Sequence, residues 1–172
     1  MAESFPEYID RTLGYVKGRD PLRILQSTPR ALERRLAGVP RRRLFRPPAE
    51  GKWSAAQILA HQSEMEMLWG YRIRTILEKN GAPIIGIDQD AWAKAGRYER
   101  IEPRESLAAF RAIRKANLDL VERLPGASLR RHGNHSQFGR LTIAGILRFL
   151  AGHDVNHSLQ IEAILGRRRA GR

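Results

Sequence analysis

Cysteine is absent from this chain of 172 residues, and the sequence contains no long apolar run. Without cysteine there can be no disulfide scaffold, cysteine zinc finger, iron–sulfur site or cysteine nucleophile. Because no apolar run approaches the roughly 20 residues of a membrane helix, we expect no membrane span. The N-terminal segment MAESFPEYID is acidic and lacks the apolar core of a secretory signal. We therefore expect a cytoplasmic protein.

Acidic and aromatic residues are scarce. The 18 Asp and Glu stand against 31 Lys and Arg, the formal net charge is +13, and aromatic residues make up 7% of the chain. A nucleic-acid reader would gather its basic residues on one face, often interleaved with aromatic rings. Here they are spread out, apart from residues 41–43 with Arg46 and the tail residues 167–169 with Arg172. We therefore expect no nucleic-acid partner, although the positive field favours anionic small molecules.

Helix-capping and helix-breaking residues divide the chain into helical segments. The expected helices cover residues 8–17, 21–27, 29–37, 54–79, 89–95, 103–124 and 142–165. Pro29 predicts a kink or a break between the second and third of these. Residues 80–102 are expected to be largely irregular and residues 126–140 to form a polar loop, because no segment alternates as a strand does.

Four long helical segments joined by polar loops predict an all-α four-helix bundle. The connection 80–102 is long enough to cross over an end of the bundle. The length fits one domain, which we place at residues 1–166, followed by a basic tail at 167–172 that we expect to be disordered.

Three histidines fall on helical stripes that are otherwise apolar. Positions i, i+3, i+4 and i+7 share one face of a helix. His61 interrupts the stripe of the 54–79 helix, and His153 and His157, four residues apart, interrupt that of the 142–165 helix. Because a buried unpaired imidazole costs roughly 1–3 kcal/mol, a shared divalent cation would explain all three. Zinc or nickel suits such ligands best, and three of them leave a coordination position open, as in catalytic sites.

The same residues also allow a plainer interpretation, in which each core histidine is hydrogen-bonded to a carbonyl group or a neighbouring side chain. Neighbouring polar residues are candidates to bond a ligating ring or a coordinated water: Glu64, Asn156 and Gln160. Asp154 points about 100° away from His153, so we do not expect it to reach the metal. His132 and His135 are expected on the surface of the polar loop. His135 becomes an accessory group if that loop folds over the open end of the bundle.

Several segments resemble the DinB-like family of bacterial metalloproteins. The matching segments are residues 52–54 (KWS) ahead of the His61 helix, 88–92 (DQDAW), 138–142 (FGRLT) and 153–161 (HDVNHSLQI). The resemblance covers roughly residues 7–166. It implies a four-helix bundle with a right-handed crossover and a metal held by three histidines: His61, His153 and His157. Some family members are transferases or isomerases that use bacillithiol, mycothiol or glutathione, which implies a low-molecular-weight thiol as cosubstrate.

Two classes of function remain open. In the first, a metal-dependent enzyme acts on a small molecule: the cation holds a thiol in its ionised form for S-transfer to an electrophile, or it activates water for hydrolysis. Glu64 or His135 is then the candidate catalytic proton acceptor. In the second, a non-catalytic protein associated with stress or DNA damage binds the metal or a small ligand without turnover.

Two further expectations concern the surroundings of the metal and the assembly. The connection 80–102 and the loop 126–140 should form the rim of the site, with four candidate residues: Asp88, Trp92, His135 and Arg140. The resemblance predicts a homodimer, and a broad apolar face on the 103–124 helix offers an interface: Phe110, Ile113, Leu120 and Leu124.

Overall fold

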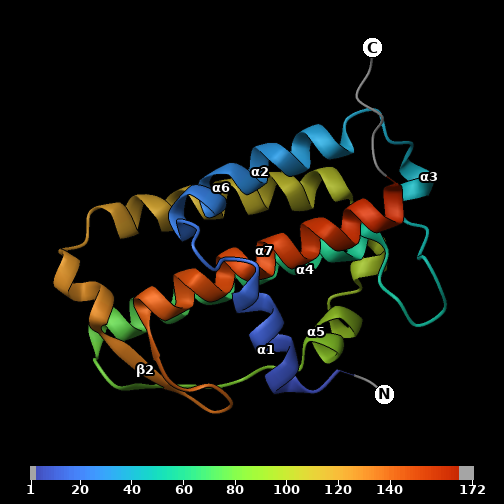
Figure 1. The fold of residues 1–172 in the computed structure, drawn as a ribbon. Helices are drawn as coiled ribbons and strands as arrows, with labels where there is room; N and C mark the ends of the chain where they lie inside the picture. Colours follow the sequence, from blue (N-terminus) through green and yellow to red (C-terminus); the bar gives the residue numbers. More distant parts are fainter. Residues whose placement is uncertain (1–2, 167–172) are drawn as a thin grey trace.

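The computed structural model describes residues 3–166, and four long helices form a bundle within this range (Figure 1). They are α2 (Pro21–Leu36), α4 (Ala55–Glu78), α6 (Pro103–Glu122) and α7 (Ile143–Leu165). Helix α4 packs against α6 and α7, and α2 packs against the same two helices. The predicted all-α bundle is confirmed. The expected disorder of the tail concerns residues 167–172, which lie outside the described range.

The bundle helices begin where the sequence supplies caps. The Ser54 hydroxyl accepts the Gln57 backbone N–H while the Gln57 side chain accepts the Ser54 N–H, which forms a capping box ahead of α4. Asp20 caps α2 ahead of Pro21, and Thr142 caps α7. These side chains satisfy N–H groups that have no partner inside a helix.

A shorter helix, α1 (Phe5–Gly14), lies across α7. It begins before the expected residue 8 because Ser4 and Glu7 form a capping box. Gly152 on α7 permits the close approach, since a Cβ there would lie 2.1 Å from the Thr12 carbonyl oxygen. The glycine therefore lets α1 dock directly on the helix that carries His153.

The connection between α4 and α6 runs back along the bundle, as Figure 1 shows. It contains β1 (Ala82–Ile84), α5 (Gln89–Ala95) and the 3-10 helix η1 (Tyr98–Arg100). Two contacts show that α4 and α6 run in the same direction: Arg114 pairs with Glu66, and further along both helices Arg74 donates to Asn117. The expected crossover at residues 80–102 is thus confirmed.

A small sheet replaces the predicted polar loop. After the 3-10 helix η2 (Gly126–Arg130), β2 (His132–His135) pairs in parallel with β1 and antiparallel with β3 (Gly139–Thr142). The expectation of no strand was wrong, because the pairing joins Ala82 to Gly133 across a long stretch of sequence. Gly133 leaves room for the buried Ile84 side chain, since a Cβ at this position would lie 2.3 Å from Ile84 Cδ1.

Helix α2 continues through Pro29, where a kink or break was predicted. A proline removes the hydrogen bond to the carbonyl four residues earlier, here that of Leu25. In the structure Arg114 Nη1 donates to this Leu25 oxygen at 2.9 Å. Arg114 is 2% exposed and also pairs with Glu66 at 2.8 Å and Asp154 at 2.7 Å. The lost helical bond is therefore replaced by a buried side chain of α6, and the helix stays whole.

The core has two main apolar clusters. The first is centred on α4, α7 and the sheet, and includes Trp69, Ile73, Ile143, Phe149 and Leu150. The second lies nearer the start of α4 and the end of α7, and includes Leu32, Leu59, Phe110 and Ile161. Phe110 is 1% exposed in the second cluster, so it contributes to the core of its own chain rather than to a free face. Ile113, Leu120 and Leu124 are half-buried, and the homodimer stays a prediction.

A short helix, α3 (Arg41–Leu44), lies in the connection between α2 and α4. Within residues 3–166, no helix is long and apolar enough to cross a membrane.

Candidate metal centre

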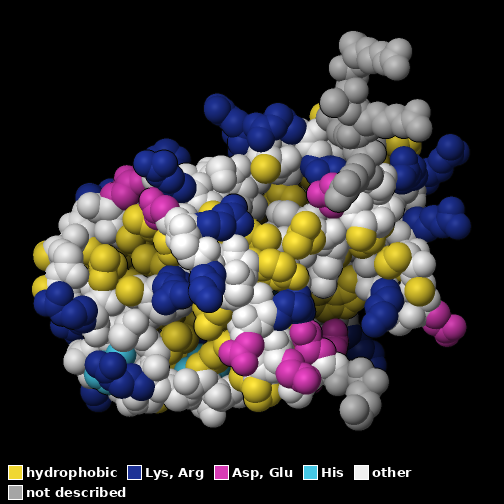
Figure 2. Space-filling view, in the orientation of Figure 1, with side chains coloured by type: hydrophobic (Ala, Val, Ile, Leu, Met, Phe, Trp, Pro, Cys, Tyr) yellow, Lys and Arg dark blue, Asp and Glu magenta, His cyan; other side chains and the backbone are white. Residues whose placement is uncertain are grey.

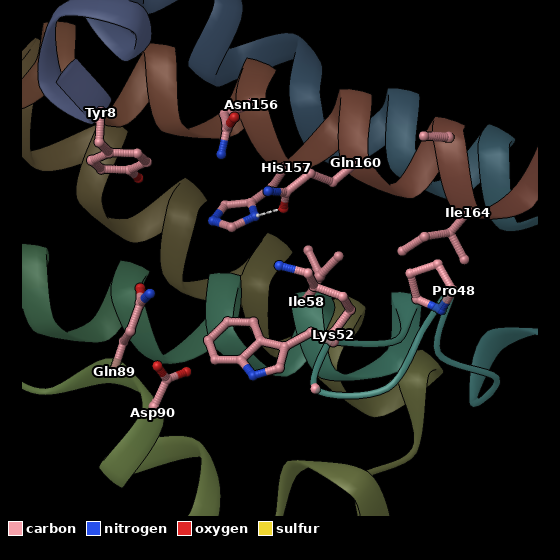
Figure 3. A pocket seen from close by; sticks show the side chains of 13 residues that line it. Tyr8, Pro48, Lys52, Ile58, Gln89, Asp90, Asn156, His157, Gln160 and Ile164 are labelled. Atoms are coloured by element: carbon pink, nitrogen blue, oxygen red, sulfur yellow. Dashed lines mark hydrogen bonds between the residues drawn. The ribbon is translucent and has the colours of Figure 1, made fainter. Parts of the chain in front are cut away.

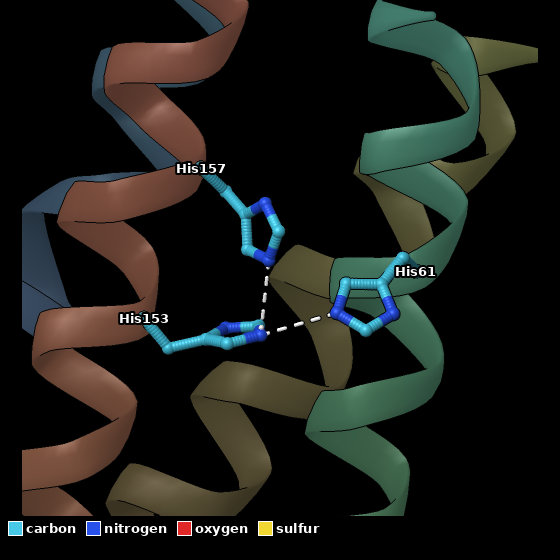
Figure 4. A group of neighbouring side chains, drawn as sticks. All are labelled: His61, His153 and His157. Carbon is cyan, nitrogen blue, oxygen red and sulfur yellow. Dashed lines mark hydrogen bonds between the residues drawn. The ribbon is translucent and has the colours of Figure 1, made fainter. Parts of the chain in front are cut away.

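His61, His153 and His157 meet in the core where α4 and α7 run side by side (Figure 4). His61 lies on α4, and the other two lie one turn apart on α7. Their exposed fractions are 1%, 5% and 6%, respectively. The two helical stripes therefore face each other, and the histidines lie between the two apolar clusters.

The three rings direct nitrogen atoms toward one another. His153 Nε2 lies 3.1 Å from His61 Nε2 and 3.0 Å from His157 Nε2, and the candidate ligand atoms all lie within 4.8 Å of one another. Nitrogens about 2.1 Å from a tetrahedral ion are about 3.4 Å apart, so these distances fit one shared ion. In the described part of the chain, this is the one group of three or more His, Asp or Glu residues with such geometry.

Burial keeps the three imidazoles neutral. It lowers the pKa of His61 and of His153 well below the usual value, and the neighbouring imidazoles lower both further. Burial also lowers the pKa of His157 to about 4. A neutral imidazole keeps the lone pair with which it binds a metal. The cluster therefore offers up to three uncharged nitrogen ligands at neutral pH.

Hydrogen bonding supports the metal interpretation over the plainer one. His157 Nδ1 lies 2.7 Å from Gln160 Oε1 (Figure 3). Because an amide oxygen only accepts, Nδ1 carries the proton and Nε2 presents its lone pair to the cluster. His61 Nδ1 is buried without a hydrogen-bond partner among the described residues, and the Trp53 ring lies 5.0 Å from the His61 ring. The three Nε2 atoms converge, and because His157 Nε2 carries a lone pair, hydrogen bonds between the rings cannot satisfy both contacts of His153 Nε2, whereas a shared divalent ion fits them.

Of the other polar candidates, Gln160 alone contacts a ring of the cluster. Glu64 accepts a hydrogen bond from the Tyr98 hydroxyl and lines neither cavity beside the cluster. Asn156 Oδ1 accepts from Arg11 Nη1 at 2.5 Å, which fastens α7 to α1. Asp154 belongs to the buried ion pair described above, in agreement with its expected direction.

Two open cavities flank the histidine cluster. The first, about 470 Å³, is lined by His157 together with α5, α1 and the loop ahead of α4 (Figure 3). The second, about 480 Å³, is lined by His61 and His153 together with α1 and the sheet region. Tyr8 and Gln89 line both cavities. The cluster therefore lies between the two cavities and faces both.

His135 is buried in the wall of the second cavity, although its loop was expected at the surface. His135 Nδ1 accepts the backbone N–H groups of Gln137 at 3.1 Å and Phe138 at 3.4 Å, so the ring proton resides on Nε2. Burial, and then the charge of Arg72, lowers the pKa of His135 to about 4. The side chain is thus a neutral hydrogen-bond donor. His132 is half-buried in the same strand.

The remaining rim candidates divide in two. Asp88 lines the second cavity, whereas Trp92 packs partly buried against the first apolar cluster and Arg140 is exposed on β3. Sequence reasoning missed the cavity residues Tyr8 and Arg72. Tyr8 reaches the site only through the docking of α1, but a lone arginine between Trp69 and Ile73 in a buried helix was a detectable signal.

The basic side chains are dispersed over the face shown in Figure 2, with apolar areas between them. Within the run at residues 41–43, Arg41 pairs with Glu102 and lies 4.4 Å from the Phe45 ring centre, while Arg43 donates to the Leu165 carbonyl at 2.8 Å. These contacts give the run a structural role. The absence of a nucleic-acid partner stays a prediction.

Comparison with known proteins agrees with the geometry. The sequence profile of the DinB superfamily matches residues 24–161. No curated protein matches the chain. Among solved structures, the chain is similar to YfiT from Bacillus subtilis, described as a probable metal-dependent hydrolase with an unusual four-helix bundle topology. The TM-score is 0.76 at 20% identity, over 84% of this chain and 83% of that one. The fold and the extent of the profile match establish that the chain belongs to the DinB superfamily.

Proposed function

We propose that the chain is a metal-dependent enzyme in which His61, His153 and His157 hold one divalent ion, zinc or nickel, to activate a nucleophile against a small electrophile. The observation that carries this proposal is the convergence of three neutral imidazoles between two open cavities. A structural metal site is closed by four protein ligands, whereas a catalytic one keeps a position open. Three ligands beside accessible space match the catalytic pattern.

A divalent ion in this position lowers the pKa of a thiol or a water molecule that coordinates it. The chain's own part is to hold the ligands and the reactants. Gln160 fixes the tautomer of His157, and Trp53 packs against His61. The two cavities can receive two organic molecules, one on each side of the cluster. S-transfer requires two such molecules, a thiol and an electrophile, so we place it first.

The contacts of Glu64 and His135, the two proton acceptors expected from the sequence, also favour a thiol as the nucleophile. Glu64 is occupied by the Tyr98 hydroxyl, and His135 presents an N–H group to its cavity. A site without an available proton acceptor suits a nucleophile that ionises on coordination to the metal alone. A thiol, with an ordinary pKa of about 8.5, needs a much smaller shift than water at about 15.7. We therefore propose a low-molecular-weight thiol as cosubstrate.

Metal-assisted hydrolysis is the second candidate. Its support is the similarity in fold to YfiT, the probable metal-dependent hydrolase. A water nucleophile would occupy little space, which would leave one of the two cavities for the leaving group. A non-catalytic metal-binding role is the third candidate, and it requires that neither S-transfer nor hydrolysis occurs.

The metal content tests the first part of the proposal. Elemental analysis of the purified protein should find about one divalent ion per chain, and His61→Ala, His153→Ala and His157→Ala should each lose most of it. Asn156→Ala is the matched control on α7, because its side chain bonds Arg11 instead of a ring of the cluster. Full metal retention in two of the three histidine variants contradicts the site.

Activity tests the second part. The zinc- and nickel-loaded proteins are assayed with several low-molecular-weight thiols and a generic electrophile, and separately with activated esters. We expect thiol conjugation that disappears in His157→Ala. Ester hydrolysis without conjugation would favour the second candidate. Activity that persists in His157→Ala contradicts the enzymatic proposal.

The assembly and the location complete the proposal: we expect a cytoplasmic homodimer. Light scattering at micromolar concentration measures the mass, and a monomer contradicts the dimer.

A further inference from the structure

Two arginines are buried within residues 3–166, and they differ in their partners. Arg114 is 2% exposed and lies between the carboxylates of Glu66 and Asp154. Arg72 is 4% exposed, yet its one hydrogen bond within residues 3–166 runs from Nη2 to the Ile85 carbonyl, at 2.6 Å. A buried cation without a carboxylate is costly unless something else neutralises it. Among the described residues, Arg72 therefore has no counter-ion.

The position of Arg72 indicates where an anionic partner would bind. Arg72 lines the second cavity, together with His61 and His153. Its guanidinium carbon lies 4.3 Å from the centre of the Trp69 ring, and the His135 ring stacks on the same indole with a centroid distance of 6.2 Å and an interplanar angle of 23°. His135 contributes an Nε2–H donor, because its Nδ1 accepts two backbone N–H groups. A cation and a neutral donor thus both lie against the Trp69 ring in the wall of the second cavity.

The acidic residues of this cavity do not neutralise Arg72. Glu3 is paired with Arg11 at 2.6 Å. Asp88 accepts the backbone N–H groups of Asp90 and Ala91, both at 3.0 Å, as the cap of α5. Burial lowers the pKa of Arg72 only to about 10, so the guanidinium stays charged at neutral pH.

We infer that Arg72 and His135 form an oxyanion subsite, which binds a carboxylate or phosphoryl group of a substrate whose other end reaches the three-histidine cluster. The second half of this statement rests on the proposed function, whereas the subsite itself does not. The guanidinium lies over Trp69, eight residues beyond His61 on α4, which corresponds to roughly 12 Å along the helix axis. The subsite and the cluster therefore lie at different points along the cavity, and the substrate is an elongated anion.

Matched ligands test the subsite in the full-length protein without metal. Octanoate, octylphosphonate and neutral octanamide are titrated into the metal-free protein, and the NMR signals of Arg72 Nε–H and His135 Nε2–H are followed. We expect at least one oxyanion to shift both signals and to bind about tenfold to hundredfold more tightly than the amide, as hydrogen bonds to charged groups do. Equal binding of the amide and both anions, or anion binding that leaves both signals unmoved, overturns the subsite.

Substitutions of Arg72 test whether its side chain causes the preference for the anion. Arg72→Met removes the charge but keeps most of the apolar stem, and it should abolish the preference for the anion. Arg72→Lys keeps a charge and should retain part of the preference, which provides a second test if the methionine variant does not fold. Arg148→Met is the matched control, because Arg148 is exposed on α7 and lines neither cavity. An equal loss of preference in Arg148→Met would show a long-range charge effect and overturn the assignment.

A second ligand series separates the subsite from the proposed metal chemistry. ω-Mercaptoalkanoates and the corresponding amides, with increasing numbers of methylene groups, are titrated into the zinc-loaded protein. We expect the preference for the carboxylate to peak at one spacer length and to vanish in Arg72→Met. Thiol binding without a carboxylate preference at any length overturns the subsite and leaves the metal site intact. Arg72-dependent octanoate binding in a protein that takes up no zinc supports the subsite and contradicts the proposed function.

Discussion

Gln160 Oε1 accepts the Nδ1 proton of His157 at 2.7 Å, and this bond decides which ring nitrogen faces the histidine cluster. With Nδ1 protonated, Nε2 carries the lone pair, and it points to within 3.0 Å of His153 Nε2. Residues behind a metal ligand commonly set its tautomer and orientation in this way.

Gln160→Leu should weaken zinc binding about tenfold to hundredfold, because the ring of His157 loses the acceptor that holds its tautomer. The affinity is measured by competition with a chelator of known strength. Gln160→Glu is the control, since a carboxylate still accepts the Nδ1 proton and should keep the affinity or raise it. A leucine variant that binds zinc as tightly as the parent contradicts a role for Gln160.

Arg114→Met should lower the free energy of unfolding by about 3–5 kcal/mol, because it leaves Glu66 and Asp154 buried without their counter-ion. Urea unfolding of the metal-free protein measures the change. Arg111→Met is the matched control on the same helix: its ion pair with Glu33 is exposed, and such pairs contribute under about 1 kcal/mol. Equal effects of the two substitutions would refute a special role for Arg114.

Pro29→Ala tests the replacement of the missing helical hydrogen bond. An alanine at this position has an N–H group that can donate to the Leu25 carbonyl, where Arg114 donates now. We therefore expect Pro29→Ala to be more stabilising in the Arg114→Met background than in the parent. A double-mutant cycle from urea unfolding measures this coupling. Strictly additive effects would mean that the two residues act independently.

Gly152→Ala should destabilise the protein by about 1–3 kcal/mol, since the new Cβ would meet the Thr12 carbonyl oxygen at 2.1 Å and push α1 away from α7. Thermal unfolding measures the loss, and hydrogen exchange should show faster opening of α1. Gly14→Ala provides the control, because a Cβ there has no neighbour within 4 Å. The idea fails if α1 exchanges at the parental rate in Gly152→Ala.

The metal-free protein should lose stability as the pH falls from about 6.5 to about 4. Burial holds the pKa of His157 at about 4 and those of His61 and His153 well below the usual value, so the folded state resists protonation. The unfolded chain takes up these protons near pH 6.5, and its free energy falls relative to the folded state by up to about 1.4 kcal/mol per pH unit for each such group. Urea unfolding at several pH values measures the slope, and His157→Gln should make it shallower. A flat profile across this window contradicts neutral buried histidines.

The inward positions of the three histidines could be predicted from the sequence because helical periodicity is local. His153 and His157 lie one turn apart in any α-helix, and His61 interrupts an apolar stripe of its own. The bundle and the start of α4 at the Ser54 cap followed from similarly local patterns. Gln160 could be predicted too, since a position three residues after His157 lies on the same face.

Other features depended on residues far apart in the chain. The β1–β2 pairing joins Ala82 to Gly133. Neither short segment shows the alternation of apolar and polar residues that would have predicted a strand. Helix α2 passes through Pro29 because Arg114 of another helix supplies the missing donor. Local rules for proline cannot include a partner that only the folded bundle brings near.

The helices and the inward position of each histidine follow from sequence patterns with a period of a few residues. It is folding that brings the three rings to one centre between two cavities and buries the side chain of Arg72 there without a carboxylate. These properties arise from the packing of α1, α4, α7 and the sheet against one another. Distances between such elements, and the desolvation that shifts the pKa values, exist only once the chain has folded.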